Sequence, residues 1–193
     1  HVLRNDDVEL HPDSIGKLLP FVEAIVVDEH NQQVPPGENG ELLFAREEVI
    51  SGYYRQPERL TEALTDITGR TWFRTGDLAS VDAEGFFFIR GRKKDMIIVG
   101  GENVFAAEVE AVLMNHPKVR EAAVKGVPAT GVRTALGELI KAYIVPADDT
   151  LTEREIKQYC YDHLPSYKVP TIIAFLPALP RNPSGKVVKE ELG

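Results

Sequence analysis

The sequence predicts an α+β protein in which a β-rich first half precedes a half that alternates helices with strands. Two observations predict this fold class. Up to about residue 90, alternating apolar runs are separated by turns rich in Pro, Gly and Asn, a pattern typical of strands. After residue 95, two segments have apolar residues at helical spacing, and further strand-like runs separate them.

In the first half, strands are predicted at Val22–Val27, Glu41–Ala45, Thr71–Val81 and Phe86–Arg90. Asp82–Gly85 is predicted to be the hairpin turn between the last two strands. A short helix is predicted at Pro57–Leu64, because proline is favoured at the first position of a helix.

In the second half, Gly100–Asn103 is predicted to open a helix that continues through Ala106–Asn115. Thr152–Glu155 has the pattern of a capping box, and the helix it opens should end at Pro165. Its apolar face would consist of Ile156, Tyr159, Cys160 and Leu164. Further strands are predicted at Glu121–Lys125, Gly137–Val145 and Thr171–Leu176.

Composition excludes several classes of protein. The chain has 193 residues, of which 43% are hydrophobic and 27% charged, as is usual for soluble globular proteins. A net charge of -8 argues against general nucleic-acid binding. Cys160, the one cysteine, excludes an internal disulfide and fits the reducing cytoplasm. No apolar run approaches the roughly 20 residues that span a bilayer, and the five histidines show no metal-ligand spacing.

Three segments could carry chemistry. Lys186 follows Pro180-Arg-Asn-Pro-Ser-Gly185, a loop that its prolines stiffen, so a long cation is held at a set place. Arg90–Lys94 gathers four cations beside a glycine-rich stretch, although such a run is more often a solvated turn. The charged run Arg90–Asp95 is also the expected domain boundary. Thr75-Gly76-Asp77 interrupts an aromatic strand with a carboxylate that could accept two hydroxyl hydrogen bonds, although most such aspartates are turn residues.

Taken together, these segments resemble the C-terminal part of the adenylate-forming (AMP-binding) superfamily, which comprises acyl-CoA synthetases, peptide-synthetase adenylation domains and luciferases. The segments that carry the resemblance, in family order, are Gly40-Glu-Leu42, Ser51-Gly-Tyr-Tyr54, Trp72-Phe-Arg-Thr-Gly-Asp77, Gly91-Arg-Lys-Lys-Asp95, Gly100-Gly-Glu-Asn103, Glu108-Val-Glu110, Leu164-Pro-Ser-Tyr167 and the Lys186 loop. The stretch Met96–Val104 is similar to that of the acyl-CoA synthetase branch.

The resemblance implies a fold and a reaction. Residues 1–93 would be the end of a large N-terminal domain, a β-barrel-like subdomain. Residues 94–193 would be a small, mobile α+β C-terminal domain with a short mixed or antiparallel sheet and flanking helices. The enzyme would be an acid–thiol ligase. A carboxylic acid, fatty or aryl, would react with ATP to give an acyl-adenylate, and CoA would then take the acyl group.

By position in the family motifs, Asp77 would hold the ribose hydroxyls, Arg92 would support the ribose and phosphates, and Ile89 would pack near the sugar. Lys186 would be the catalytic lysine of the adenylation step. Lys94 would be the hinge about which the small domain rotates for the second step. That rotation would present Gly100, Gly101 and Glu102, which would line the channel for CoA.

The remaining motifs of the family would lie upstream of His1, together with the acyl pocket and the ligands of the expected Mg²⁺. The chain by itself would then be inactive, and its missing partner would be the N-terminal portion of the same protein. Alternatives are a peptide-synthetase-type or luciferase-like enzyme, a non-catalytic stand-alone module, and a split enzyme completed by another chain. A fragment would expose apolar surface on its barrel part.

Overall fold

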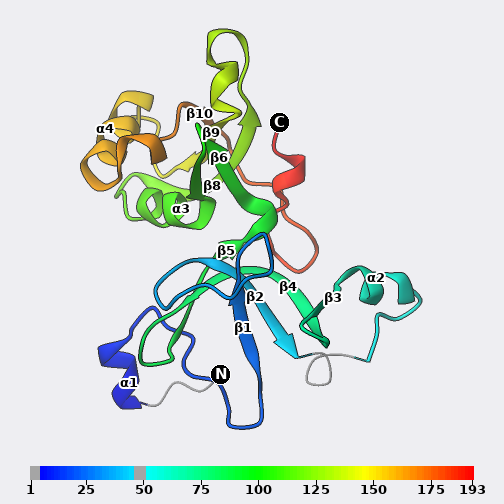
Figure 1. Cartoon of the computed structure of the whole chain (residues 1–193). Coiled ribbons are helices and arrows are strands. Elements are labelled where there is room, and N and C mark those ends of the chain that lie inside the picture. Colours follow the sequence, from blue (N-terminus) through cyan, green and yellow to red (C-terminus); the bar gives the residue numbers. More distant parts are fainter. Residues whose placement is uncertain (1–4, 46–50) are drawn as a thin grey trace. The chain divides into compact units, whose positions relative to one another are not determined.

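The computed structural model describes residues 5–45 and 51–193 (Figure 1). The chain divides into two compact units, His1–Lys94, called the first unit, and Asp95–Gly193, called the second unit. A short helix, α1 (Asn5–Leu10), begins the described part of the first unit.

The first unit is built on a curled antiparallel sheet (Figure 1). Its strands are β1 (Ala24–Val27), β2 (Gly40–Ala45), β3 (Leu64–Ile67), β4 (Arg70–Val81) and β5 (Phe87–Arg92). The order is β1-β2-β4-β3, and β5 also pairs with β4. The 12-residue β4 is therefore the central strand, which contacts three neighbours.

Both faces of this sheet bury apolar side chains, because successive residues of a strand point to opposite faces. One cluster joins Val26, Leu42, Ala79 and Phe87. The other joins Val27, Leu43, Ala45 and Trp72. The first unit nevertheless exposes large apolar side chains, since Leu10, Phe21 and Tyr54 are 76%, 72% and 84% exposed.

The second unit has a mixed three-stranded sheet. Its strands are β8 (Val119–Pro128), β9 (Glu138–Pro146) and β10 (Ile172–Phe175), in the order β10-β9-β8. The central β9 runs parallel to β10 and antiparallel to β8. A separate hairpin is formed by β6 (Met96–Val99) and β7 (Glu102–Phe105).

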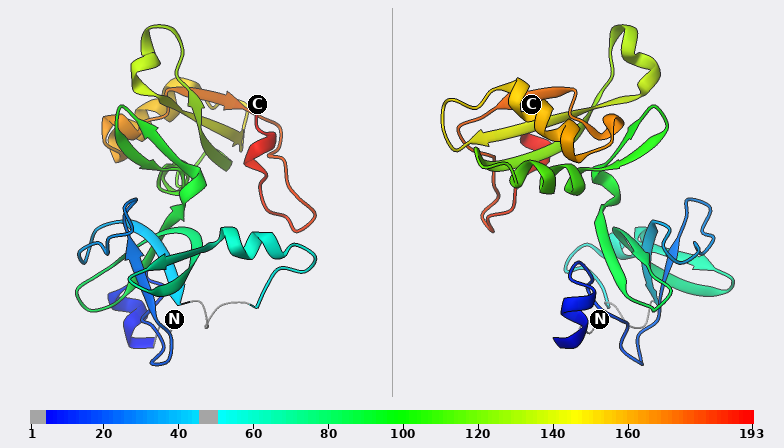
Figure 2. Two further views of the ribbon diagram at one scale, coloured as in Figure 1. Left: turned by 45° about the vertical axis from the view of Figure 1, so that its right-hand side comes forward. Right: turned by 90° about the vertical axis from the view of Figure 1, so that its left-hand side faces the viewer.

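Two helices and the C-terminal segment complete the core of the second unit (Figure 2). Helices α3 (Ala106–Met114) and α4 (Glu153–His163) bury Val109, Leu113, Ile156 and Cys160 with one face of the sheet. On the other face, Tyr143 and its neighbours pack against Leu179 and Leu192. Short 3-10 helices lie at Lys93–Asp95 (η2), Gly131–Leu136 (η3), Ser166–Lys168 (η4) and Lys189–Glu191 (η5).

These elements confirm the predicted α+β class, and two local predictions are wrong. Gly100–Asn103 does not open a helix: Gly100 and Gly101 have φ of 59° and 89° and form the turn of the β6–β7 hairpin. The hairpin forms because Ile97 and Val104 pair across it and are both buried. The first-half helix, α2, spans only Pro57–Glu62, because Leu64 begins β3.

The capping box of α4 is confirmed. The Thr152 side chain accepts a hydrogen bond from the Glu155 backbone N–H at 3.2 Å, and the Glu155 carboxylate accepts one from the Thr152 N–H at 2.9 Å. Across the described residues, every helix is too short or too polar to cross a membrane.

Candidate functional site

A bulge in β4 displays Asp77. Glu41 of β2 pairs with Leu78 and Leu43 pairs with Arg74, so three residues of β4 stand opposite Leu42 alone. Gly76 permits this irregularity because its φ is +71°, a conformation that other residues rarely adopt. The Thr75 hydroxyl donates to the Leu42 carbonyl at 2.7 Å and accepts from the Asp77 N–H at 2.9 Å. Bulges of this kind re-aim side chains at functional sites.

Asp77 and Arg92 form an ion pair across β4 and β5. Arg92 Nε lies 2.8 Å from Asp77 Oδ1, and the two residues are register partners. The Arg92 guanidinium also donates to the Thr75 carbonyl at 3.2 Å. The Asp77 side chain is 30% exposed, and a carboxylate offers more lone pairs than one arginine uses. Hydroxyl donors of a ligand can therefore still bind to it.

A cavity of about 340 Å³ opens beside this pair and is lined by Gly76, Arg92, Lys93 and Lys94. Three of these four residues are cations, so an anionic ligand would be favoured there. Ile89 lies on β5, three residues before Arg92, and its side chain is 41% exposed.

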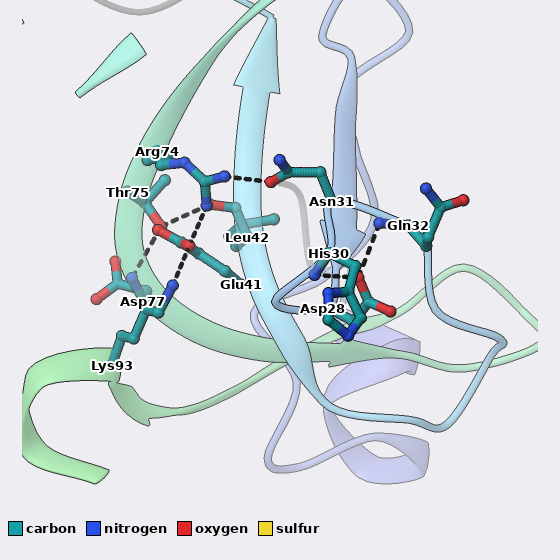
Figure 3. Close-up of polar contacts among 10 residues, drawn as sticks. All are labelled: Asp28, His30, Asn31, Gln32, Glu41, Leu42, Arg74, Thr75, Asp77 and Lys93. Carbon is teal, nitrogen blue, oxygen red and sulfur yellow. Dashed lines mark hydrogen bonds and ion pairs between the residues drawn. The ribbon is translucent and has the colours of Figure 1, made fainter. Parts of the chain in front are cut away.

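A buried carboxylate holds together two cations, one of which, Lys93, also lines the cavity (Figure 3). Glu41 is 5% exposed, and its Oε2 accepts from Lys93 Nζ at 2.9 Å and from Arg74 Nη1. Arg74 donates in turn to the side chain of Asn31. Removing one partner of a buried ion pair costs about 3–5 kcal/mol, so Glu41 needs these cations in the sheet on which Asp77 lies.

In the second unit, Lys186 lies on a preorganised loop that projects from the body (Figure 2). Asn182 Oδ1 accepts three hydrogen bonds, from the Ser184 N–H at 3.1 Å, the Ser184 hydroxyl at 2.8 Å and the Lys186 N–H at 2.9 Å. The Asn182 N–H donates to the Lys186 carbonyl at 2.9 Å. Lys186 itself is exposed, and no side chain in the described part of the chain pairs with its ammonium group. The backbone of the loop is therefore held by hydrogen bonds, while the Lys186 ammonium group remains available to a ligand.

The β6–β7 turn is held to the loop before β9. Gly100 donates its N–H to the Leu136 carbonyl at 2.8 Å, and the Ile98 N–H donates to Glu138 Oε2 at 2.8 Å. A side chain at Gly101 would meet no other atom within 4 Å, and Glu102 is exposed. The turn therefore presents a smooth strip of backbone beside a carboxylate.

The structure thus brings together Asp77 and Arg92, with Ile89 and Lys94 in the same unit, and places Gly100–Glu102 and Lys186 in the other. Sequence reasoning missed Thr75 as the residue that braces the bulge, Asn182 as the organiser of the loop, and Glu41 with Lys93. Asn182 could have been found, since asparagine commonly bonds to the backbone of its own turn.

Metal binding is not supported by the side chains that the structure describes. Between residues 5 and 45 and from 51 onward, His, Cys, Asp and Glu form no group of three or more that could hold an ion. The described residues therefore offer no such group for the Mg²⁺ that the resemblance implies.

Two protein families match the sequence. Residues 108–186 match the family described as AMP-binding enzyme C-terminal domain, and residues 1–54 match the family described as AMP-binding enzyme. A long-chain-fatty-acid–CoA ligase of Escherichia coli O6:H1 is 41% identical over 186 residues. That alignment covers 96% of this chain and 32% of the relative.

Solved structures agree with the sequence matches. The o-succinylbenzoate CoA synthetase of Bacillus subtilis, in complex with its acyl-adenylate OSB-AMP, is 33% identical with a TM-score of 0.86. The match covers 98% of this chain and 37% of that one; the same enzyme has also been solved with ATP and magnesium ion. The amide bond synthetase McbA of Marinactinospora thermotolerans is 35% identical with a TM-score of 0.79, covering 97% and 37%.

The chain spans about a third of the length of the relatives it matches. One family match falls in each unit. The chain therefore belongs to the AMP-binding, adenylate-forming enzyme family.

Proposed function

We propose that the chain is the C-terminal part of an ATP-dependent acyl-CoA ligase. In the first step, a carboxylate oxygen attacks the α-phosphorus of ATP, giving acyl-adenylate and pyrophosphate. In the second, the thiol of CoA attacks the acyl carbon, giving the thioester and AMP. The observation that carries the proposal is the Asp77–Arg92 pair beside a cation-lined cavity.

In the first step, the free lone pairs of Asp77 bind the ribose hydroxyls, and Arg92 supports the ribose and phosphates. Ile89 offers an exposed apolar side chain for the sugar. Lys186 supplies a positive charge to the α-phosphate and the attacking carboxylate as they react. Its loop is already ordered by Asn182, so little reorganisation is needed when the charge develops.

In the second step, rotation about Lys94 replaces Lys186 by the β6–β7 turn. A lid that serves one site with two faces needs only a few hinge residues. Lys94 is the last residue of the first unit, which suits this role. The absence of side chains at Gly100 and Gly101 leaves room for the pantetheine arm, and Glu102 borders the same strip.

The rest of the site is proposed to lie in an upstream portion of the same protein, together with the acyl pocket and the Mg²⁺ ligands. The first unit exposes Leu10, Phe21 and Tyr54, and the chain spans about a third of its relatives' length; both agree with this proposal. The chain alone is then expected to be inactive.

The acid is proposed to be a fatty or an aryl acid, as in the names of the ligase and of the o-succinylbenzoate synthetase reported above. A second acceptor deserves a test beside CoA. Because a matched relative is an amide bond synthetase, an amine could take the acyl group from the same adenylate.

The test begins with the intact mass of the protein in its native source, which is expected to exceed 21.5 kDa. Pyrophosphate release by that protein is then measured with a panel of fatty and aryl acids, with CoA or an amine as acceptor. Acid-dependent release, followed by CoA-dependent thioester formation, supports the proposal. Product formation only with the amine would mean that the acceptor is an amine and not the thiol of CoA. No release with any acid would contradict the ligase.

A further inference from the structure

The Glu41–Lys93 ion pair ties the end of the first unit to the interior of its sheet. Glu41 comes from β2 and Lys93 from the 3-10 turn η2, 52 residues later. The Glu41 side chain is 6% exposed, whereas Lys93 reaches it from the surface and remains 49% exposed. Arg74 contacts the same carboxylate oxygen, so two cations share one buried anion.

The preceding residue is tied down as well. Arg92 pairs with Asp77, and Lys93 pairs with Glu41, so consecutive side chains anchor the chain to β4 and β2. Charge-assisted hydrogen bonds of this kind are about twice as strong as neutral ones. The division between the two units follows immediately, after Lys94.

We propose that Glu41 and Lys93 form a clamp that fixes the first-unit end of the hinge, so that rotation begins only after Lys93. This inference rests on the proposed function, because that function requires the rotation. A hinge works best when few residues absorb the change in backbone angles. Holding Lys93 therefore limits the number of orientations that the second unit must search before each step. Lys93 is a positioning residue under this proposal, and it touches no substrate.

A competing role for Lys93 is direct binding of phosphate, since it lines the same cavity as Arg92. The geometry favours the clamp, because Lys93 Nζ is already 2.9 Å from a buried carboxylate. An ammonium group has three donors, so the contact with Glu41 leaves the phosphate role to be tested. The two roles differ in kinetics: a phosphate ligand mainly sets the KM for ATP, whereas a clamp mainly sets kcat.

The variant to use is Lys93→Met, which keeps most of the length of the side chain and removes its charge. Arg74 still compensates Glu41 in this variant, so the first unit is expected to fold. Lys93→Arg should restore the clamp, because arginine can donate to the same carboxylate. Lys157→Met is the matched control, since Lys157 is also ion-paired, with Glu153 on the surface of α4.

The first measurement is the ¹⁵N NMR order parameter of residues 92–95 in the 193-residue chain. In the wild type, Lys93 is expected near about 0.85, the value of rigid backbone, and below about 0.6 in Lys93→Met. Leu78 and Ala79 should keep their values, and Lys93→Arg should behave as the wild type. A flexible Lys93 in the wild type, or an unchanged value in Lys93→Met, would overturn the clamp. This arm does not depend on ligase activity.

The second measurement is the kinetics of the complete ligase. Lys93→Met is expected to lower kcat about tenfold or more at an unchanged KM for ATP, because small misplacements of a catalytic face are costly. Lys93→Arg should recover most of the loss, and Lys157→Met should show none. A raised KM with unchanged kcat would make Lys93 a phosphate ligand and overturn the proposal, as would no change at all. If the wild type shows no acid-dependent pyrophosphate release, the proposed function fails, and the NMR result still decides the clamp.

Discussion

Arg92 Nε lies 2.8 Å from Asp77 Oδ1, where the β4–β5 pairing sets the two residues opposite each other. The pair stands at a bulge, so the carboxylate is directed by backbone geometry as well as by its partner. Both side chains remain partly exposed, so a ligand can reach the pair. Its contribution to stability should be small, because exposed ion pairs contribute about 0–1 kcal/mol.

The first prediction follows from this geometry. Asp77→Asn keeps the size of the side chain but removes its charge and one acceptor. In the complete ligase, the KM for ATP should rise about tenfold or more, because hydrogen bonds to charged groups contribute about 1.5–3 kcal/mol. Steady-state kinetics with varied ATP checks this, and the melting temperature should change little. Asp149→Asn, on an exposed loop, is the control. An unaltered KM for ATP would exclude Asp77 from the nucleotide site.

The second prediction concerns Lys186. Lys186→Ala should lower the rate of acyl-adenylate formation by about 10²–10³, the usual effect of removing one preorganised charge from a transition state. Thioester formation from supplied acyl-adenylate should be spared, because a different face of the second unit serves that step. The two half-reactions are measured separately, by pyrophosphate release and by CoA-thioester formation. Equal losses in both would rule out a specific adenylation role.

The third prediction concerns the organiser of the Lys186 loop. Asn182→Ala removes the oxygen that accepts three hydrogen bonds, so Lys186 should no longer be held in place. Adenylation should fall about tenfold, with the second step unchanged, because preorganisation and not charge is lost. Ser184→Ala is the matched control, since it removes only the hydroxyl bond and should cost much less. Full adenylation activity in Asn182→Ala would show that the loop is ordered without it.

The sequence predicts local structure correctly where residues close together in the chain determine it. Thr152 and Glu155 bond to each other's backbone within one turn, so the pattern alone predicts the helix start. The prediction that Gly100–Asn103 opens a helix was wrong, because two glycines before a helical segment fit either a helix start or a hairpin turn. The pairing of Ile97 with Val104, and their burial against the rest of the second unit, decided the matter.

Part of the candidate site could be predicted from the sequence for the same reason, because its residues lie in local motifs. Asp77, Arg92 and Lys186 stand in motifs, so their types and spacing drew attention to them. Glu41 and Lys93 also lie in segments that the sequence analysis names, but their pairing was not predicted, because neither segment indicates the other as its partner. Their contact joins residues 52 positions apart and depends on the register of β2 against β4. Local sequence patterns do not predict contacts between residues so far apart in the chain.

The fourth prediction concerns the hinge. Lys94→Pro would fix φ near −65° and remove a backbone N–H, so the rotation proposed about this residue should stall. Thioester formation should fall much more than adenylation, because only the second step needs the rotated state. Lys94→Ala, which keeps the backbone freedom, is the control. Single-turnover measurement of each half-reaction checks the prediction, and a normal second step in Lys94→Pro would remove Lys94 as the hinge.

The fifth prediction is a pH dependence of the second unit. A hydrogen bond from Lys118, together with those from Thr152, lowers the pKa of Glu155 from 4.5 to about 2. A carboxyl whose pKa is lower in the folded state stabilises the fold above its unfolded pKa. That contribution is lost as the pH falls through the folded pKa. The Glu155 contribution should therefore be complete above about pH 4.5 and disappear towards pH 2.

Glu155→Gln tests this contribution, because glutamine cannot ionise and weakens both the capping box and the Lys118 contact. Thermal unfolding followed from pH 7 to pH 2 should show the largest gap between variant and wild type near neutrality. The gap should shrink between pH 4.5 and 2, where the wild-type carboxylate becomes protonated. Glu153→Gln, on the same helical turn but paired only with Lys157, should show a smaller gap. A gap independent of pH would mean that Glu155 acts through its shape and not through its charge.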